Sequence, residues 1–126
     1  MIARNTSAAM ESDLESGLHR VRLSFLEHLD ERLDQMEVHC DLLADPHTRD
    51  QALKVIQSIA HKIAGTAETV GFADLGRHAI TLDLDIATYE EAPSADGYED
   101  LLLLIDALIE TGSDILRVHF EQNAGR

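Results

Sequence analysis

The chain has 126 residues and a formal net charge of −14, from 24 acidic and 10 basic side chains. A chain of this length supports one domain with one core. Nucleic acids and anionic membranes attract clustered Lys and Arg, so this composition argues against both as partners. Cys40 is the only cysteine. A single cysteine cannot form an internal disulfide. This favours a reducing compartment, which we expect to be the cytoplasm.

The apolar pattern predicts helices only, because no stretch alternates with a period of two for long. We expect residues 1–10 to form a flexible N-terminus and residues 11–126 to form one domain. A first helix is predicted from Ser12 or Asp13 to about Leu43, and Gly17 is a candidate break between a short leading helix and a long one. Its predicted inward positions are Leu14, Leu18, Phe25, Leu29, Leu33, Met36 and Cys40.

Three further helices follow. Thr48 and Gln51 have the spacing of a capping box and predict the start of the second helix, which Gly71 would end. The third is expected from Ala73 or Asp74 to the breaking segment 91–94, and the fourth over residues 95–122. Short connections between helices of this length favour an antiparallel up-down four-helix bundle, here with a short N-terminal helix or extension. The predicted inward residues are Leu75, Ala79, Leu82 and Ile86 in the third helix, and Leu101, Leu102, Ile105, Leu108, Ile109, Ile115 and Leu116 in the fourth.

His61 is the candidate functional residue of the second helix. Ile56, Ile59, Ile63 and Val70 recur at helical spacing and predict one buried stripe, and His61 points to the opposite side. Glycine inside a helix costs about 1 kcal/mol relative to alanine. Gly65 lies one turn after the histidine. The close approach of another molecule beside the imidazole would explain a glycine at this position. The residues that share this half of the helix, and that we expect to form a docking surface, are Lys54, Gln57, Ser58, Ala64, Gly65 and Glu68.

The segment His61-Lys62-Ile63-Ala64-Gly65-Thr66, followed by Gly71-Phe72 and Leu75, resembles the signature of histidine-containing phosphotransfer (HPt) domains. Ala64 stands where that family usually carries a lysine. The resemblance implies a four-helix bundle in which His61 accepts a phosphoryl group from an aspartyl phosphate and passes it to a second aspartate. Lys62, the nearest cation in sequence, would support the phosphate, and Lys54 is a second candidate.

The same resemblance implies the partners. These would be the receiver domains of response regulators in a multistep phosphorelay, with a hybrid sensor kinase as a further candidate. The receiver would supply the Mg²⁺ site, so no cofactor and no metal are expected on this chain. The sequence has no Gly-rich phosphate loop, so we expect no ATP-dependent kinase activity of its own and a phosphate that comes from another protein. We expect a monomer.

Other interpretations remain open at this level. The chain could be a non-catalytic helical adaptor that binds a receiver without efficient transfer, or a structural bundle with an incidental histidine. The pairs Asp74/His78 and Glu15/His19 have the spacing of a metal edge but are more typical of surface hydrogen bonds. The acidic run 82–85 is interpreted as a solvated helix face. Residues 101–105 are interpreted as core, with a dimer contact as the alternative.

Overall fold

The computed structural model describes the backbone of residues 2–124 and the side chains of residues 9–122. This part of the chain is all helical and contains no strand, which confirms the predicted all-α class. None of the described helices is long and apolar enough to cross a bilayer. The elements are α1 (Ile2–Asp41), the short 3₁₀ helix η1 (Leu42–Ala44), α2 (Pro46–Ala67), α3 (Ala73–Glu91) and α4 (Ala95–Ala124).

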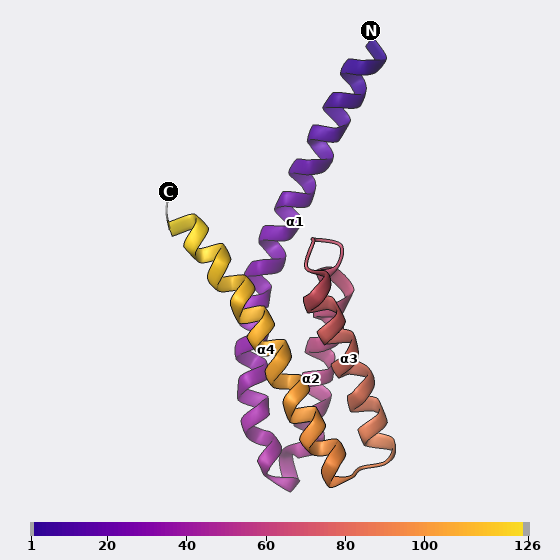
Figure 1. Ribbon diagram of the computed structural model, residues 1–126, viewed down its shortest axis with the longest axis vertical. Coiled ribbons are helices and arrows are strands. Elements are labelled where there is room, and N and C mark those ends of the chain that lie inside the picture. Colours follow the sequence, from indigo (N-terminus) through magenta and orange to yellow (C-terminus); the bar gives the residue numbers. More distant parts are fainter. Residues whose placement is uncertain (1, 125–126) are drawn as a thin grey trace.

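The four α-helices form an up-down bundle (Figure 1). In the described chain α1 packs against α2 and α4, α3 packs against the same two helices, and α1 and α3 lie diagonally opposite. All four contribute apolar side chains to one core, which contains no buried polar residue among those described. The largest fully buried side chains are Leu29, Met36, Leu43, Leu53, Ile56, Ile63, Leu75, Leu82, Ile86, Leu101, Ile105 and Leu108.

The predicted form of the first helix is wrong in two respects. α1 is a single helix of 40 residues, about 60 Å long, without a break at Gly17. Its N-terminal part continues past the end of the bundle into solvent (Figure 1). Leu14 and Leu18, predicted as core, are 66% and 46% exposed, because no helix faces this part of α1 and burial begins at Phe25. The division at residue 10 falls within α1 and remains a prediction.

The start of α2 also differs from the prediction. The residue that caps the helix is Asp45, whose side chain accepts a hydrogen bond from the backbone N–H of His47 (2.9 Å), with Pro46 in the first turn. The Thr48 hydroxyl does not cap the helix. It donates instead to the carbonyl oxygen of Leu42 at 2.6 Å. The capping-box prediction was wrong because an aspartate followed by proline supplies the cap and a suitable first-turn φ three residues earlier.

A tight reversal joins α2 to α3. Gly71 adopts a φ of 99°, a left-handed conformation that glycine takes without steric cost. The backbone N–H of Phe72 donates to the carbonyl oxygen of Ala67 at 2.8 Å. Arg22 of α1 fixes the loop from outside, because its Nε donates to the carbonyl oxygen of Val70 at 2.8 Å. These two hydrogen bonds fix the loop between α2 and α3. The loop in turn sets the register of α3 against α2.

Cys40 is a half-buried free thiol near the end of α1. Burial, reinforced by the carboxylates of Asp106, Asp41 and Glu37, raises the pKa of this thiol above its ordinary value. A thiol with a raised pKa is mostly protonated at neutral pH and is therefore a poor nucleophile. The cysteine lies at the boundary of the core and is only partly buried, although the helical pattern predicted an inward position.

The cap assignment is testable by a pair of substitutions. Asp45→Ala removes the side-chain acceptor at the start of α2 and should lower the free energy of unfolding by about 1 kcal/mol. Gln51→Ala, which would break the capping box predicted from sequence, should change it by less than about 0.5 kcal/mol. Urea denaturation followed by circular dichroism measures both. A larger loss for Gln51→Ala than for Asp45→Ala would restore the capping-box interpretation.

Candidate functional site

His61 lies on α2, six residues before the helix ends at Ala67. Its side chain is 80% exposed, whereas Ile59 and Ile63 on either side of it in sequence are 5% and 0% exposed. The orientation predicted from helical spacing therefore agrees with the structure. The histidine stands at the seam between α2 and α3, on the side of the bundle away from the α1–α4 contact.

Asp83 of α3 is the partner of this histidine. Its Oδ2 lies 2.9 Å from His61 Nδ1, and its side chain is 25% exposed. Gln57, one turn before His61, donates from Nε2 to Asp83 Oδ1 at 3.1 Å and to the Asp83 carbonyl oxygen at 3.2 Å. The interpretation of segment 82–85 as a simple solvated face was wrong at this residue, because Asp83 is turned toward α2 and both its carboxylate oxygens are engaged there.

The hydrogen bond defines the state of the imidazole. An ionised carboxylate only accepts hydrogen bonds, so the proton of a neutral His61 ring belongs on Nδ1. Nε2 then carries the free lone pair. A carboxylate partner of this kind also fixes the orientation of the ring. The arrangement presents a nucleophilic nitrogen on an exposed side chain whose other nitrogen is already occupied.

The helix surface beside His61 is open. A Cβ atom added to Gly65 would meet nothing within 4 Å, and the residue is exposed. Close packing of another helix therefore does not explain this glycine. Ala64 is half-buried against the core, so no long side chain rises between the histidine and the end of α2 on this side.

The other residues predicted to dock or to support a phosphate lie at different distances from His61. Lys54, Ser58, Lys62 and Glu68 are all exposed. Among the described side chains neither lysine forms an ion pair. Lys54 stands two helical turns before His61, about 10 Å along the axis, and Lys62 is its direct neighbour in sequence. The structure therefore joins Gln57, His61 and Asp83 directly and leaves both lysines without a described contact to the histidine.

One of the two candidate metal edges has its carboxylate engaged elsewhere. Asp74 pairs with Arg77 of its own helix and not with His78. No group of three or more His, Cys, Asp or Glu in the described part of the chain has the geometry to hold a metal ion. The closest described contact of the site is the one between the imidazole and its carboxylate.

A comparison with protein families shows the family of this chain. The family model described as Hpt domain matches residues 20–111, which is most of the chain. The chain belongs to the Hpt domain family. Hpt domains in general carry out histidine phosphotransfer in phosphorelays and interact with receiver domains of response regulators. No curated protein and no solved structure matches the chain.

The role of Asp83 was missed, although a signal for it exists in the sequence. Two antiparallel helices joined by a tight turn pair residues at nearly equal distances from that turn. The reversal at residues 68–72 sets Gly76 against Ala67 and Glu68. The same register, continued along both helices, brings residue 83 to residue 61.

The ring state of His61 gives a prediction that does not depend on function. In the native protein at a pH where the ring is neutral, the proton should reside almost entirely on Nδ1. Asp83→Ala should shift most of the population to the Nε2–H tautomer, which free imidazoles favour, whereas Asp85→Ala, two residues further on, should not. Long-range ¹H–¹⁵N correlation spectra of the histidine rings measure the tautomers. An unchanged ring pattern in Asp83→Ala would show that this carboxylate does not hold Nδ1.

Proposed function

We propose that the chain is a histidine phosphotransfer protein in which His61 carries the phosphoryl group between aspartates of receiver domains. The observation that carries this proposal is the exposed imidazole whose Nδ1 is held by Asp83, beside the open surface at Gly65. Membership of the Hpt domain family supports the same reaction. A cytoplasmic location, and residues 11–126 as the working unit, belong to this proposal.

The transfer is a substitution at phosphorus. The Nε2 lone pair of His61 attacks the phosphorus of an aspartyl phosphate on a receiver. The P–N bond forms, the acyl P–O bond breaks, and the aspartate leaves as a carboxylate. A second receiver aspartate then attacks the phosphorus, and the P–N bond electrons return to Nε2. Such reactions depend on alignment and charge neutralisation more than on covalent assistance from the protein.

Asp83 contributes charge and alignment in this proposal. When Nε2 bonds to phosphorus, the ring that keeps its Nδ1 proton becomes positively charged. A carboxylate 2.9 Å from Nδ1 stabilises that charge and holds the ring at a fixed angle. Because the ring is 80% exposed, water screens this interaction and we assign it an effect on the order of tenfold in rate. Lys62 supports the phosphoryl oxygens from the exposed side.

The proposed docking surface is the exposed face of α2 around His61. It comprises open helix backbone at Gly65, the small side chain of Ala64, and a rim of polar residues. Receiver domains, including one on a hybrid sensor kinase, are the proposed partners. The receiver supplies Mg²⁺ and most cationic groups, which this face lacks. The rim residues are Lys54, Gln57, Ser58 and Glu68.

A second candidate function is favoured by one observation. Ala64 stands where the family usually carries lysine, and Asp83 adds a negative charge next to the histidine. Both features disfavour an incoming anionic phosphoryl group. The corresponding function is a helical adaptor that binds a receiver domain without efficient transfer. The two functions differ in one outcome, because only the phosphotransfer protein would acquire a phosphoryl group on His61.

The phosphoacceptor is tested with His61→Gln. Native protein incubated with a receiver charged by acetyl phosphate should acquire an acid-labile label, and the variant should acquire none. Because the side chain is exposed, helicity and melting temperature should stay nearly constant. His28→Gln, at an exposed histidine on α1, is the matched control and should keep the label. Receiver binding without label in the native protein would support the adaptor, and neither binding nor label would leave a structural bundle.

The open surface is tested at Gly65. Gly65→Ala should raise the free energy of unfolding by up to about 1 kcal/mol, because the site is helical, exposed and free of neighbours. Gly65→Gln should preserve the fold but lower the transfer rate by about a hundredfold or more, because a displacement of about 1 Å in alignment has that effect. Thermal denaturation and single-turnover transfer from one charged receiver give both values. Undiminished transfer by Gly65→Gln would contradict a docking face at this position.

A further inference from the structure

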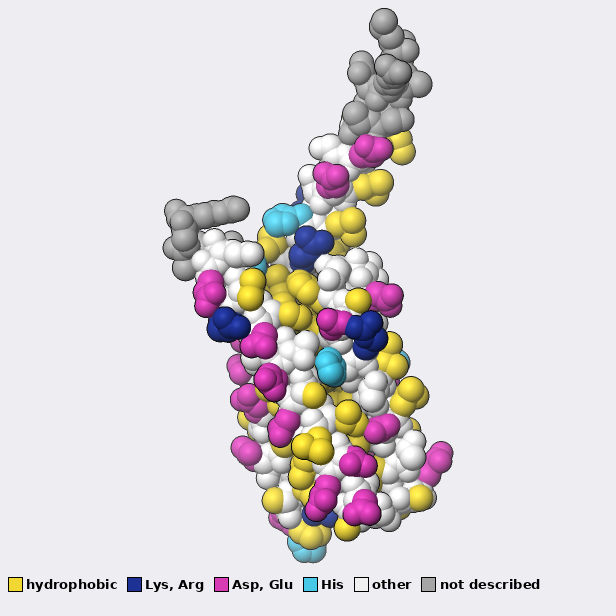
Figure 2. All heavy atoms as spheres, in the orientation of Figure 1, with side chains coloured by type: hydrophobic (Ala, Val, Ile, Leu, Met, Phe, Trp, Pro, Cys, Tyr) yellow, Lys and Arg dark blue, Asp and Glu magenta, His cyan; other side chains and the backbone are white. Residues whose placement is uncertain are grey.

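The projecting part of α1 carries an apolar stripe that no described residue covers. From residue 9 to residue 22 every side chain is exposed; only Gly17, which has none, is less so. Met10, Leu14, Leu18 and Val21 are 61%, 66%, 46% and 47% exposed. Figure 2 shows apolar side chains in a row along one edge of this helix. Their spacings of four, four and three residues place them on one face, which continues into buried Phe25.

The stripe has the features of a helix–helix contact. Leu14 and Val21 are seven residues apart, as are Leu18 and Phe25, so the pattern follows two heptads. Gly17 lies between them with nothing within 4 Å of an added Cβ, which permits close approach of a second helix. A solvated segment of this length is marginal as an isolated helix, because most helical stability in proteins comes from packing of an apolar face.

The charges beside the stripe select its partner. On one side Asp13 is followed seven residues later by Arg20, and on the other Glu15 is followed seven residues later by Arg22. Residues seven apart lie on nearly the same side of a helix. Two copies of this segment running antiparallel therefore set the acidic start of each against the basic end of the other, on both sides. A parallel pair would oppose like charges.

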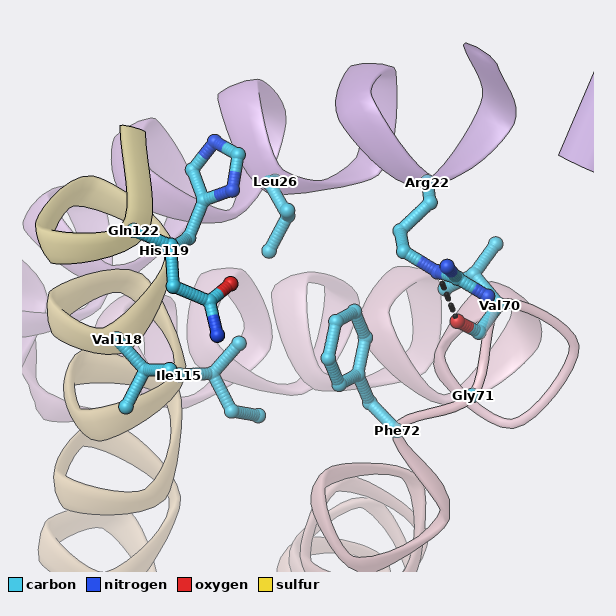
Figure 3. A pocket seen from close by; sticks show the side chains of 9 residues that line it. All are labelled: Arg22, Leu26, Val70, Gly71, Phe72, Ile115, Val118, His119 and Gln122. Atoms are coloured by element: carbon cyan, nitrogen blue, oxygen red, sulfur yellow. Dashed lines mark hydrogen bonds between the residues drawn. The ribbon is translucent and has the colours of Figure 1, made fainter. Parts of the chain in front are cut away.

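A hollow at the end of the bundle would add contact area to the antiparallel pair of α1 segments. It has a volume of about 250 Å³ and lies between α1, the α2–α3 loop and the end of α4 (Figure 3). The stripe between Met10 and Phe25 is only about 24 Å long, short for an interface that must bury about 800 Å² per partner. In an antiparallel pair the partner's Met10 lies opposite Phe25, beside this hollow. Apolar and basic groups line it, among them Arg22, Leu26, Phe72, Ile115, Val118 and His119.

From these observations we infer that the chain forms a two-fold symmetric dimer through antiparallel pairing of the projecting part of α1. The sequence analysis expects a monomer, and separately its apolar pattern predicts Leu14 and Leu18 as core residues of a single chain. Their exposure on a continuous helix removes that explanation. The proposed interface lies at the end of the bundle, along the projecting part of α1 and the hollow beside the α2–α3 loop, whereas His61 lies on α2 six residues before that helix ends.

The dimer is tested on the full chain by sedimentation equilibrium. Native protein should be dimeric at high micromolar concentration. Leu14→Asp should raise the dissociation constant at least about tenfold, because it places a charge in the apolar contact. Leu103→Asp is the matched control, since Leu103 is 68% exposed and Leu14 is 66% exposed. It should dissociate like the native protein. Both variants should keep the cooperative thermal unfolding of the bundle, measured by circular dichroism.

The antiparallel direction is tested by exchange of charges. Asp13→Arg and Arg20→Asp should each weaken the dimer several-fold, and the double variant should return to within about twofold of the native dissociation constant. These side chains are exposed, so the substitutions leave the bundle intact. A native protein that remains monomeric, a Leu103→Asp variant that dissociates in place of Leu14→Asp, or a double variant weaker than either single one would each overturn the inference.

Discussion

The arrangement of the site depends on the reversal between α2 and α3. Gly71 takes a backbone conformation that other residues adopt only with strain, and Arg22 holds the carbonyl oxygen next to it from α1. The stacked rings of Phe25 and Phe72, with centroids 5.8 Å apart, anchor the other side of the loop. Because the turn is tight and fixed, α3 has one register against α2, and that register brings Asp83 to the imidazole of His61.

This histidine has a carboxylate at Nδ1, and Lys62 is the one cation of this chain that the proposed transfer places at the phosphoryl oxygens. A carboxylate at Nδ1 raises the electron density available at Nε2, which favours attack, but its charge also repels an anionic substrate. Both effects are moderate because the ring is well solvated. In the proposed transfer this balance makes the reaction depend mainly on positive charge brought by the receiver, and the net charge of −14 on this chain is consistent with that dependence.

The sequence predicts the bundle well because apolar spacing within one helix records which side is buried. Ile56, Ile59 and Ile63 are all in the core as their spacing requires. The same spacing fails at Leu14, since periodicity identifies an apolar face but not the presence of a neighbour that covers it. It also fails to find Asp83, which is 22 residues from His61 in sequence. The contact between these two residues depends on the register of α3 against α2, and periodicity within one helix does not encode that register. The phosphoacceptor assignment itself remains a prediction.

The uninterrupted hydrogen-bond ladder of α1 has a consequence for the exchange of backbone amide hydrogens. Between residues 9 and 22 the helix is opened by local fraying alone, so its amides should exchange fast. From Phe25 onward the same ladder is packed in the core and opens only with the whole bundle. One helix thus contains two regimes of protection with no break in secondary structure between them. The border between the regimes marks where tertiary packing begins, and any body that covers the first part would move that border toward the N-terminus.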